Sequence, residues 1–86
     1  MRFIVTRRFE QAYRGLPEPL RRKTDKALLL LAENPRHPSL RLKKIQGAPG
    51  IWEAGVDRGC RLTLEIRSDA FLLRNVGKYD PTLDNP

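Results

Sequence analysis

The sequence is poor in the residues that build metal centres and disulfides. It contains one cysteine, Cys60, and one histidine, His37, among 86 residues. A single cysteine cannot form an internal disulfide, and one cysteine with one histidine cannot complete a zinc site. We therefore expect no metal and no cofactor, with Cys60 as a small buried residue and His37 as a turn residue. A chain without disulfides suits the reducing cytoplasm.

Long apolar runs are also lacking. The longest, Ala27–Ala32, has six residues, against about 20 for a membrane-spanning helix. The first residues turn polar at Thr6 and lack the apolar segment and cleavage site of a secretory signal. These features predict a soluble, cytoplasmic protein with no membrane partner.

Acidic residues are too few to balance the basic ones. Seventeen Lys and Arg stand against ten Asp and Glu, which gives a net charge of +7. Two of the acids, Asp80 and Asp84, lie in the last seven residues, so the preceding part of the chain carries +9. Such an excess attracts polyanions. RNA and DNA satisfy it equally, because phosphate neutralisation is independent of base sequence, and an acidic protein partner satisfies it too.

The first half of the chain has a helical pattern of apolar residues. A short β-prone run predicts a strand at residues 2–5, and the following spacing predicts a helix over Thr6–Gly15, with the threonine as N-cap. A second helix is expected over Pro17–Asn34. Its Leu29 and Leu30 widen the apolar stripe, which indicates either deep packing or a docking surface for a partner helix.

The second half has the pattern of a β-meander. Residues 35–50 are rich in Pro, Gly, Lys and Arg and are expected to form a basic, irregular connection. In the middle strand Leu62, Leu64 and Ile66 alternate with polar residues, so these three side chains should face the core. The predicted strands are Ile51–Val56, Cys60–Arg67 and Ala70–Lys78.

Together these elements predict a single α+β domain over residues 1–86. The two helices should pack on one face of an antiparallel-rich sheet and leave its polar face open. Pro81–Pro86 has the composition of a tail.

Arg61 is the most informative residue of the predicted polar face. A guanidinium matches phosphate bidentately and can stabilise the charge that builds on a phosphorane. The alternative is an ion pair with Glu53 or Glu65 across the sheet. Trp52 could fill the core or stack on a base, and Tyr79 could stack on a base or donate a proton.

The order of elements, together with five short segments, resembles the RelE/ParE toxin superfamily of bacterial toxin-antitoxin systems. Each segment is short, but their order and spacing extend over nearly the whole chain. The segments are Asn34–Pro38, Leu42–Gly47, Gly50–Glu53, Gly59–Leu62 and Val76–Asp80.

The resemblance implies a toxin that enters the ribosome and cleaves messenger RNA without metal, the 2′-hydroxyl attacking the adjacent phosphate. Arg61 matches the strand arginine that the family holds near that phosphate, and Lys43 and Lys44 match its basic loop. The implied partners are an acidic antitoxin, the ribosome and messenger RNA. The alternatives are a ParE-like, non-enzymatic inhibitor of DNA gyrase, or a degenerate member that binds RNA or antitoxin without cleavage.

The chain departs from the RelE-like pattern at three positions. Glu53 and Gly55 stand where RelE-like members place two lysines, and Tyr79 stands where many relatives have His or Arg. A carboxylate can serve as general base. We expect Arg61 to stabilise charge and Glu53 or Tyr79 to transfer the proton. The residues expected to bind RNA are Arg41, Lys43, Lys44, Trp52 and Lys78.

Overall fold

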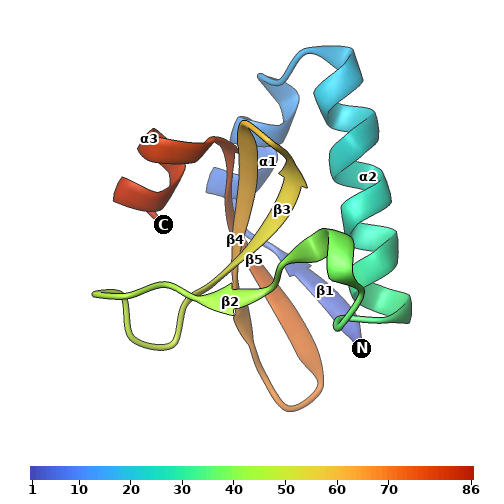
Figure 1. Cartoon of the computed structure of the whole chain (residues 1–86), viewed down its shortest axis with the longest axis vertical. Helices are drawn as coiled ribbons and strands as arrows, with labels where there is room; N and C mark the ends of the chain where they lie inside the picture. Colours follow the sequence, from blue (N-terminus) through green and yellow to red (C-terminus); the bar gives the residue numbers. More distant parts are fainter.

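The computed structural model describes all 86 residues and has an α+β architecture (Figure 1). Two helices lie on one face of a five-stranded sheet, and a third helix lies on the other. The elements in chain order are β1 (Arg2–Val5), α1 (Arg7–Arg14), α2 (Glu18–Glu33), η1 (Pro38–Leu40), β2 (Lys43–Lys44), β3 (Trp52–Asp57), β4 (Cys60–Ile66), β5 (Ala70–Lys78) and α3 (Tyr79–Asp84).

The strand order is β1-β5-β4-β3-β2. The predicted meander is confirmed, because β3, β4 and β5 pair antiparallel in sequence order. β1 pairs parallel with β5 and forms one edge of the sheet, while β2 forms the other. A register shift between Thr63 and Leu64 leaves an extra β5 residue in the β4–β5 ladder, a bulge that increases local twist.

The core lies between the sheet and α1 and α2. Leu62 and Leu64 of β4 are fully buried there, as expected, together with Leu31 of α2 and Phe71 of β5. The predicted N-cap is also confirmed. The Thr6 hydroxyl accepts from the Phe9 N–H (3.1 Å) and donates to the Leu73 carbonyl (2.7 Å), so one side chain starts α1 and fastens it to β5.

One expectation about the core is wrong, and one open alternative is decided. Ile66 is the last residue of β4, where neither helix covers the sheet, and it is 39% exposed. Leu29 is 57% exposed on α2, although Leu30 packs against the core. Deep packing therefore applies to Leu30 alone, and Leu29 is an apolar side chain on the surface.

The expected C-terminal tail is also wrong. Residues 81–84 belong to α3, which packs on the polar face of β4 and β5, and Asn85 is its C-cap. Pro81 is the third residue of α3, still within the first turn, where a proline removes no helical hydrogen bond, so it is compatible with this helix. The segment is held because the Thr63 hydroxyl and Arg74 Nε both donate to the Pro86 backbone oxygen, each at 3.0 Å.

The connection over residues 35–50 is more ordered than expected. It contains η1, capped by His37, whose Nδ1 accepts from the Ser39 N–H at 3.2 Å. It also contains β2, in which Lys43 pairs with Glu53 and Lys44 with Trp52. No helix of the structure combines the length and the apolar character needed to cross a bilayer.

Candidate functional site

Arg61, Glu53 and Tyr79 come together on the face of the sheet opposite α1 and α2. Arg61 Nε lies 3.5 Å from Glu53 Oε1, and its guanidinium carbon lies 4.8 Å from the centre of the Tyr79 ring. The side chains of Arg61 and Glu53 are only 13% and 6% exposed. β3, β4 and the start of α3 each contribute one member of this cluster, and its three residues are the catalytic set expected from the sequence.

The Arg61 guanidinium is held in place by the backbone. Its Nη1 donates to the carbonyl oxygens of Asp57 (2.5 Å) and Cys60 (3.1 Å). Nη2 makes no hydrogen bond within the chain, and every buried polar side-chain atom has a partner. Nη2 therefore meets solvent, so this arginine is fixed on one side and open to a ligand on the other.

The Glu53 carboxylate also reaches the surface. The carboxylate makes no hydrogen bond. Every fully buried side-chain oxygen in the structure does have a hydrogen-bond partner. The small exposed area of Glu53 must therefore include its oxygens. Such a carboxylate can accept a proton from a bound group, and its ion pair with Arg61 fixes its position.

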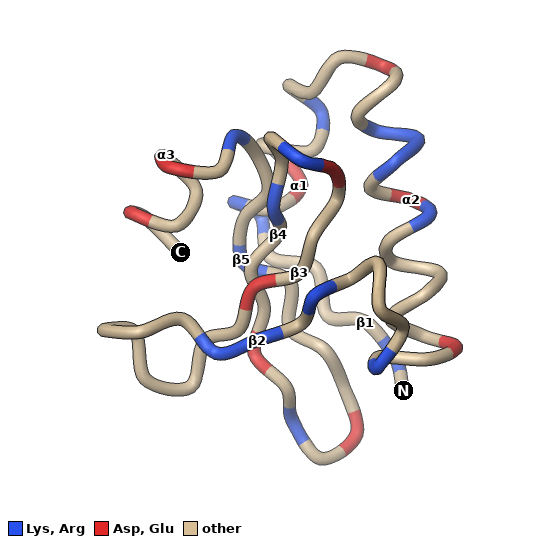
Figure 2. Tube along the Cα trace, viewed as in Figure 1, with Lys and Arg blue, Asp and Glu red and all other residues tan.

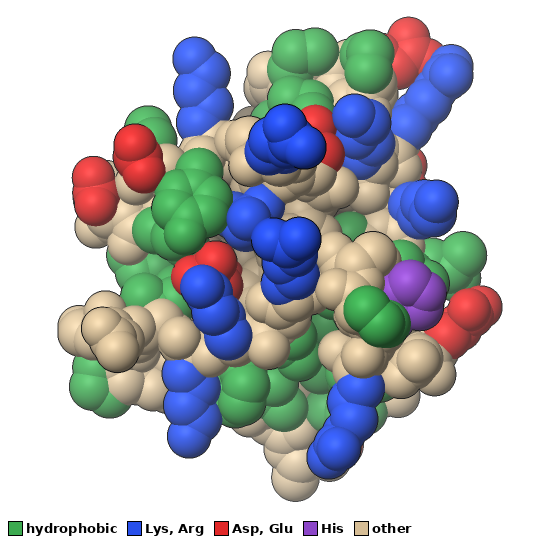
Figure 3. Space-filling view, viewed as in Figure 1, with side chains coloured by type: hydrophobic (Ala, Val, Ile, Leu, Met, Phe, Trp, Pro, Cys, Tyr) green, Lys and Arg blue, Asp and Glu red, His purple; other side chains and the backbone are tan.

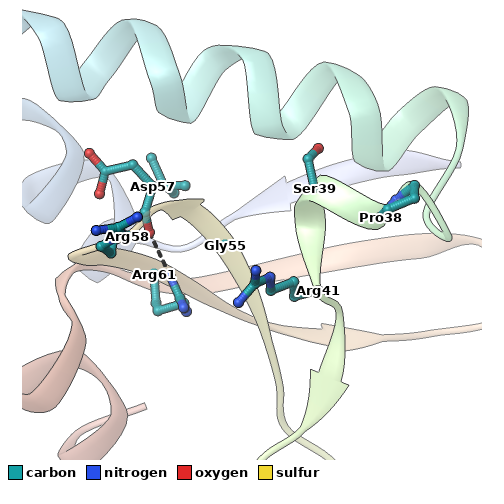
Figure 4. Close-up of a pocket in the computed structure, with 8 residues that line it drawn as sticks. Pro38, Ser39, Arg41, Gly55, Asp57, Arg58 and Arg61 are labelled. Atoms are coloured by element: carbon teal, nitrogen blue, oxygen red, sulfur yellow. Dashed lines mark hydrogen bonds between the residues drawn. The ribbon is translucent and has the colours of Figure 1, made fainter.

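A basic hollow of about 520 Å³ opens next to this cluster (Figure 4). Arg41, Arg58 and Arg61 line it from three different segments. We call it the Arg61 hollow. In the space-filling view, basic side chains gather over β2 and the β3–β4 turn around the middle of this face (Figure 3), and the trace shows the same grouping (Figure 2).

Gly55 and Asp57 keep the Arg61 hollow open and basic. A Cβ on Gly55 would lie 3.3 Å from the Leu40 carbonyl oxygen and 3.6 Å from Arg61 Nη1, so any side chain here would crowd η1 and fill the hollow. Asp57 is engaged elsewhere, through Lys23 (3.2 Å) and the Gly59 N–H (3.0 Å). Burial raises the pKa of Asp57, but these partners outweigh burial and hold the pKa below its ordinary value.

Solved structures of similar shape identify this arrangement of elements. YafQ from E. coli strain BL21(DE3) matches with a TM-score of 0.80 and 15% identity, over 94% of this chain and 97% of that one. The intact E. coli RelBE toxin-antitoxin complex matches with 0.71 and 22%, over 92% and 96%. The YoeB dimer from Staphylococcus aureus matches with 0.74 and 12%, over 92% and 95%. The chain has the RelE-type toxin fold.

No protein-family model matches the sequence, and no curated protein matches it. At the identities given above, the likeness establishes the fold alone. This likeness confirms the RelE/ParE resemblance at the level of the fold. A fold does not determine a function, so the functional residues of this chain depend on the geometry of its own site.

The RelE-type fold separates the residues expected to bind RNA. Lys43 pairs with Glu53 and lies on the Arg61 side of the sheet, whereas Lys44 pairs with Trp52 on the other side. Lys44 Nζ lies 5.5 Å from the centre of the indole ring, within range of a cation–π contact. Arg41 lines the Arg61 hollow, and Lys78 is exposed at the end of β5.

Arg58 also lines the site, although the sequence pattern did not indicate it. It lies in the Asp57–Gly59 turn between β3 and β4, three residues before Arg61. A hairpin turn places its residues beside the ends of both strands. The proximity of Arg58 to Arg61 in the sequence was the available signal.

The other candidate residues have structural roles. Glu65 pairs with Arg74 (2.5 Å) and Arg67 (3.2 Å), so Glu53 is the acid that meets Arg61. Cys60 is buried as predicted, and burial raises the pKa of its thiol, which makes it a weak nucleophile. The structure has no group of three or more His, Cys, Asp and Glu side chains that could hold a metal ion.

Proposed function

We propose that this protein is the toxin of a bacterial toxin-antitoxin system and cleaves messenger RNA on the ribosome without a metal. One observation carries the proposal. Arg61 is fixed by the backbone with one edge open to a basic hollow, beside a carboxylate and a phenol that both reach solvent. These are the groups that an internal phosphoryl transfer in RNA requires.

The reaction follows from the position of these groups. The Glu53 carboxylate accepts the proton of a ribose 2′-hydroxyl, whose oxygen forms a bond to the adjacent phosphorus. Arg61 stabilises the charge on the phosphorane oxygens. The bond from phosphorus to the 5′-oxygen then breaks, and the Tyr79 hydroxyl donates the proton that this oxygen takes. The products are a 2′,3′-cyclic phosphate and a 5′-hydroxyl.

The ribosome supplies what the small domain lacks. The hollow beside the three groups is lined by the short segments around η1, β3 and β4 of one small domain, which leaves the 2′-hydroxyl without a second surface to align it with the scissile bond. Correct alignment of reacting groups lowers barriers by about 7–11 kcal/mol in favourable cases. We expect free RNA to be a poor substrate because an unheld strand rarely adopts the in-line geometry.

The proposed protein partner is an acidic antitoxin. The E. coli RelBE structure is a toxin-antitoxin complex, and this chain shares the fold of its toxin. The chain has a net charge of +7, and three arginines line one hollow. This charge favours an acidic partner chain that covers the arginines. The exposed Leu29 on α2 offers an apolar anchor for the same partner.

The test is expression in a bacterial host, followed by mapping of RNA 5′ ends. Translated messages should be cut in register with codons, while purified protein alone should leave the same RNA largely intact. Glu53→Gln and Tyr79→Phe should each reduce cutting, because each removes one proton-transfer group with little change in volume.

A gyrase supercoiling assay on the same protein separates the alternatives. Growth arrest with uncut messages and inhibited supercoiling would show that the protein is a gyrase inhibitor and not a nuclease. Neither effect would mean a degenerate member. Full cutting by both variants would show that Glu53 and Tyr79 are not the proton carriers.

A further inference from the structure

A second hollow lies across the sheet edge from the Arg61 hollow. It has a volume of about 550 Å³ and is formed by the segment around η1 and by the ends of β3 and β4. Trp52, the only tryptophan, lines it together with the exposed Ile66. We call it the Trp52 hollow. None of the residues that line it belongs to α1 or α2.

The lining of the Trp52 hollow combines apolar surface with cations. Arg36 and Arg41 are exposed at its rim, and neither makes an ion pair within the chain. Lys44 reaches over the indole ring from β2. No acidic residue lines the hollow. An aromatic wall with unpaired cations is the composition that binds an unpaired base and its phosphates.

Arg41 connects the two hollows, because it lines both of them. Its backbone is in the left-handed region (φ 46°), at the C-terminal end of η1. This conformation costs a non-glycine residue about 1–3 kcal/mol. It turns the chain sharply between η1 and β2, at the junction of the two hollows.

We propose that the Trp52 hollow is a second RNA subsite, which takes an unpaired base of a single strand whose backbone passes Arg41 to the Arg61 hollow. Arg36 contacts a phosphate of this strand. Because the rim is basic and the hollow contains no acid, it suits a polyanion better than a neutral apolar peptide. The inference rests on the proposed RNA target and adds a site for recognition away from the bond that is cut.

The single tryptophan provides a direct readout. Titration with a short single-stranded uridine oligoribonucleotide should quench Trp52 fluorescence, because a base enters its hollow. Each phosphate contact on a single strand contributes about 0.7 to the slope of log affinity against log salt concentration. Arg36→Ala should therefore flatten the plot of log affinity against log salt by this amount and weaken binding about fivefold at 0.1 M salt.

Two further variants make the result specific. Arg7→Ala removes the same charge from the exposed start of α1, outside both hollows, and should leave the affinity nearly unchanged. Arg61→Ala should weaken binding but keep the quenching at saturation. Loss of affinity in Arg7→Ala equal to that in Arg36→Ala would overturn the subsite and indicate charge alone.

The proposed function can fail or survive independently of this inference. If RNA binds without any change in Trp52 fluorescence, the subsite is wrong, and cutting of messages on the ribosome decides the function separately. If RNA binds and quenches Trp52 while expressed protein cuts no message, the subsite stands and the nuclease does not. If the oligoribonucleotide does not bind at low salt, the subsite is wrong.

Discussion

Arg61 combines structural contacts with the chemical role that we propose for it. It neutralises the nearly buried Glu53 and satisfies two backbone carbonyls, yet one edge of its guanidinium stays open. Removing one partner of a buried ion pair costs about 3–5 kcal/mol. The cost here should be smaller, because the Glu53 oxygens reach water. A loss of activity in Arg61→Ala would therefore combine a chemical and a folding effect.

Two substitutions separate these effects. Arg61→Ala should lower cleavage by about 100-fold or more and destabilise the fold by about 1–3 kcal/mol, because Glu53 loses its countercharge. Arg61→Lys should keep most of the thermal stability, since the charge remains, but still lose most of the cleavage, since the planar fork is gone. Cleavage rates and melting temperatures measure both. Wild-type cleavage by Arg61→Ala would assign Arg61 to structure alone, and wild-type cleavage by Arg61→Lys would show that a positive charge suffices without the planar fork.

At the scale of elements, α3 decides the shape of the site. It brings Tyr79 over Arg61 and covers part of a face that the sequence pattern leaves open. The position of α3 depends on the close approach of Thr82 to Gly77. A Cβ on Gly77 would lie 2.9 Å from Thr82 Oγ1. Thr82 is buried, so it cannot move without the helix.

Gly77→Ala should therefore displace α3 and destabilise the protein by about 1–3 kcal/mol. Adding Thr82→Ala removes the clashing atom and should recover part of the loss, which a double-mutant cycle of denaturant unfolding measures. Gly59→Ala is the matched control, because a Cβ there meets nothing within 4 Å. Strictly additive effects of Gly77→Ala and Thr82→Ala would show that the two residues do not meet.

At the scale of the whole molecule, the few acids limit the repulsion among the many bases. Burial raises the pKa of Glu65, but hydrogen bonds from Arg67 and Arg74 outweigh it and hold the pKa below its ordinary value of 4.5. The pKa of Asp57 is lowered in the same way. A carboxyl group with a depressed folded-state pKa stabilises the fold above its unfolded pKa and loses that effect as pH falls through the folded value.

The melting temperature should therefore fall as pH drops below about 4.5, and the rising positive charge should add to the fall. Glu65→Gln should lower the melting temperature near neutral pH and make it fall less steeply at acidic pH. Glu33→Gln, at an exposed residue that makes no ion pair, is the control. If the melting temperature of Glu65→Gln fell as steeply at acidic pH as that of the wild type, the ion pairs of Glu65 would not contribute to stability.

The sequence by itself determined the α+β class, the two N-terminal helices, the meander and the basic character. Each follows from a local signal: apolar spacing of helical or strand period, prolines at helix starts, and a count of charges. It also indicated Arg61, Glu53 and Tyr79, because strand alternation places polar residues on a common face. The RelE/ParE resemblance added their suggested roles.

Only the tertiary structure decided how these residues meet. Residues 79–84 form α3 because β4 and β5 provide a surface for it, and no local pattern encodes that distant surface. Ile66 is exposed because the helices end before it, although its alternation is that of a core residue. The pairing of β2 with β3 separates Lys44 from Lys43, and the approach of η1 to Gly55 forms the hollow that Arg41 shares with Arg58 and Arg61. These contacts join segments far apart in the chain, and close packing in three dimensions selects them.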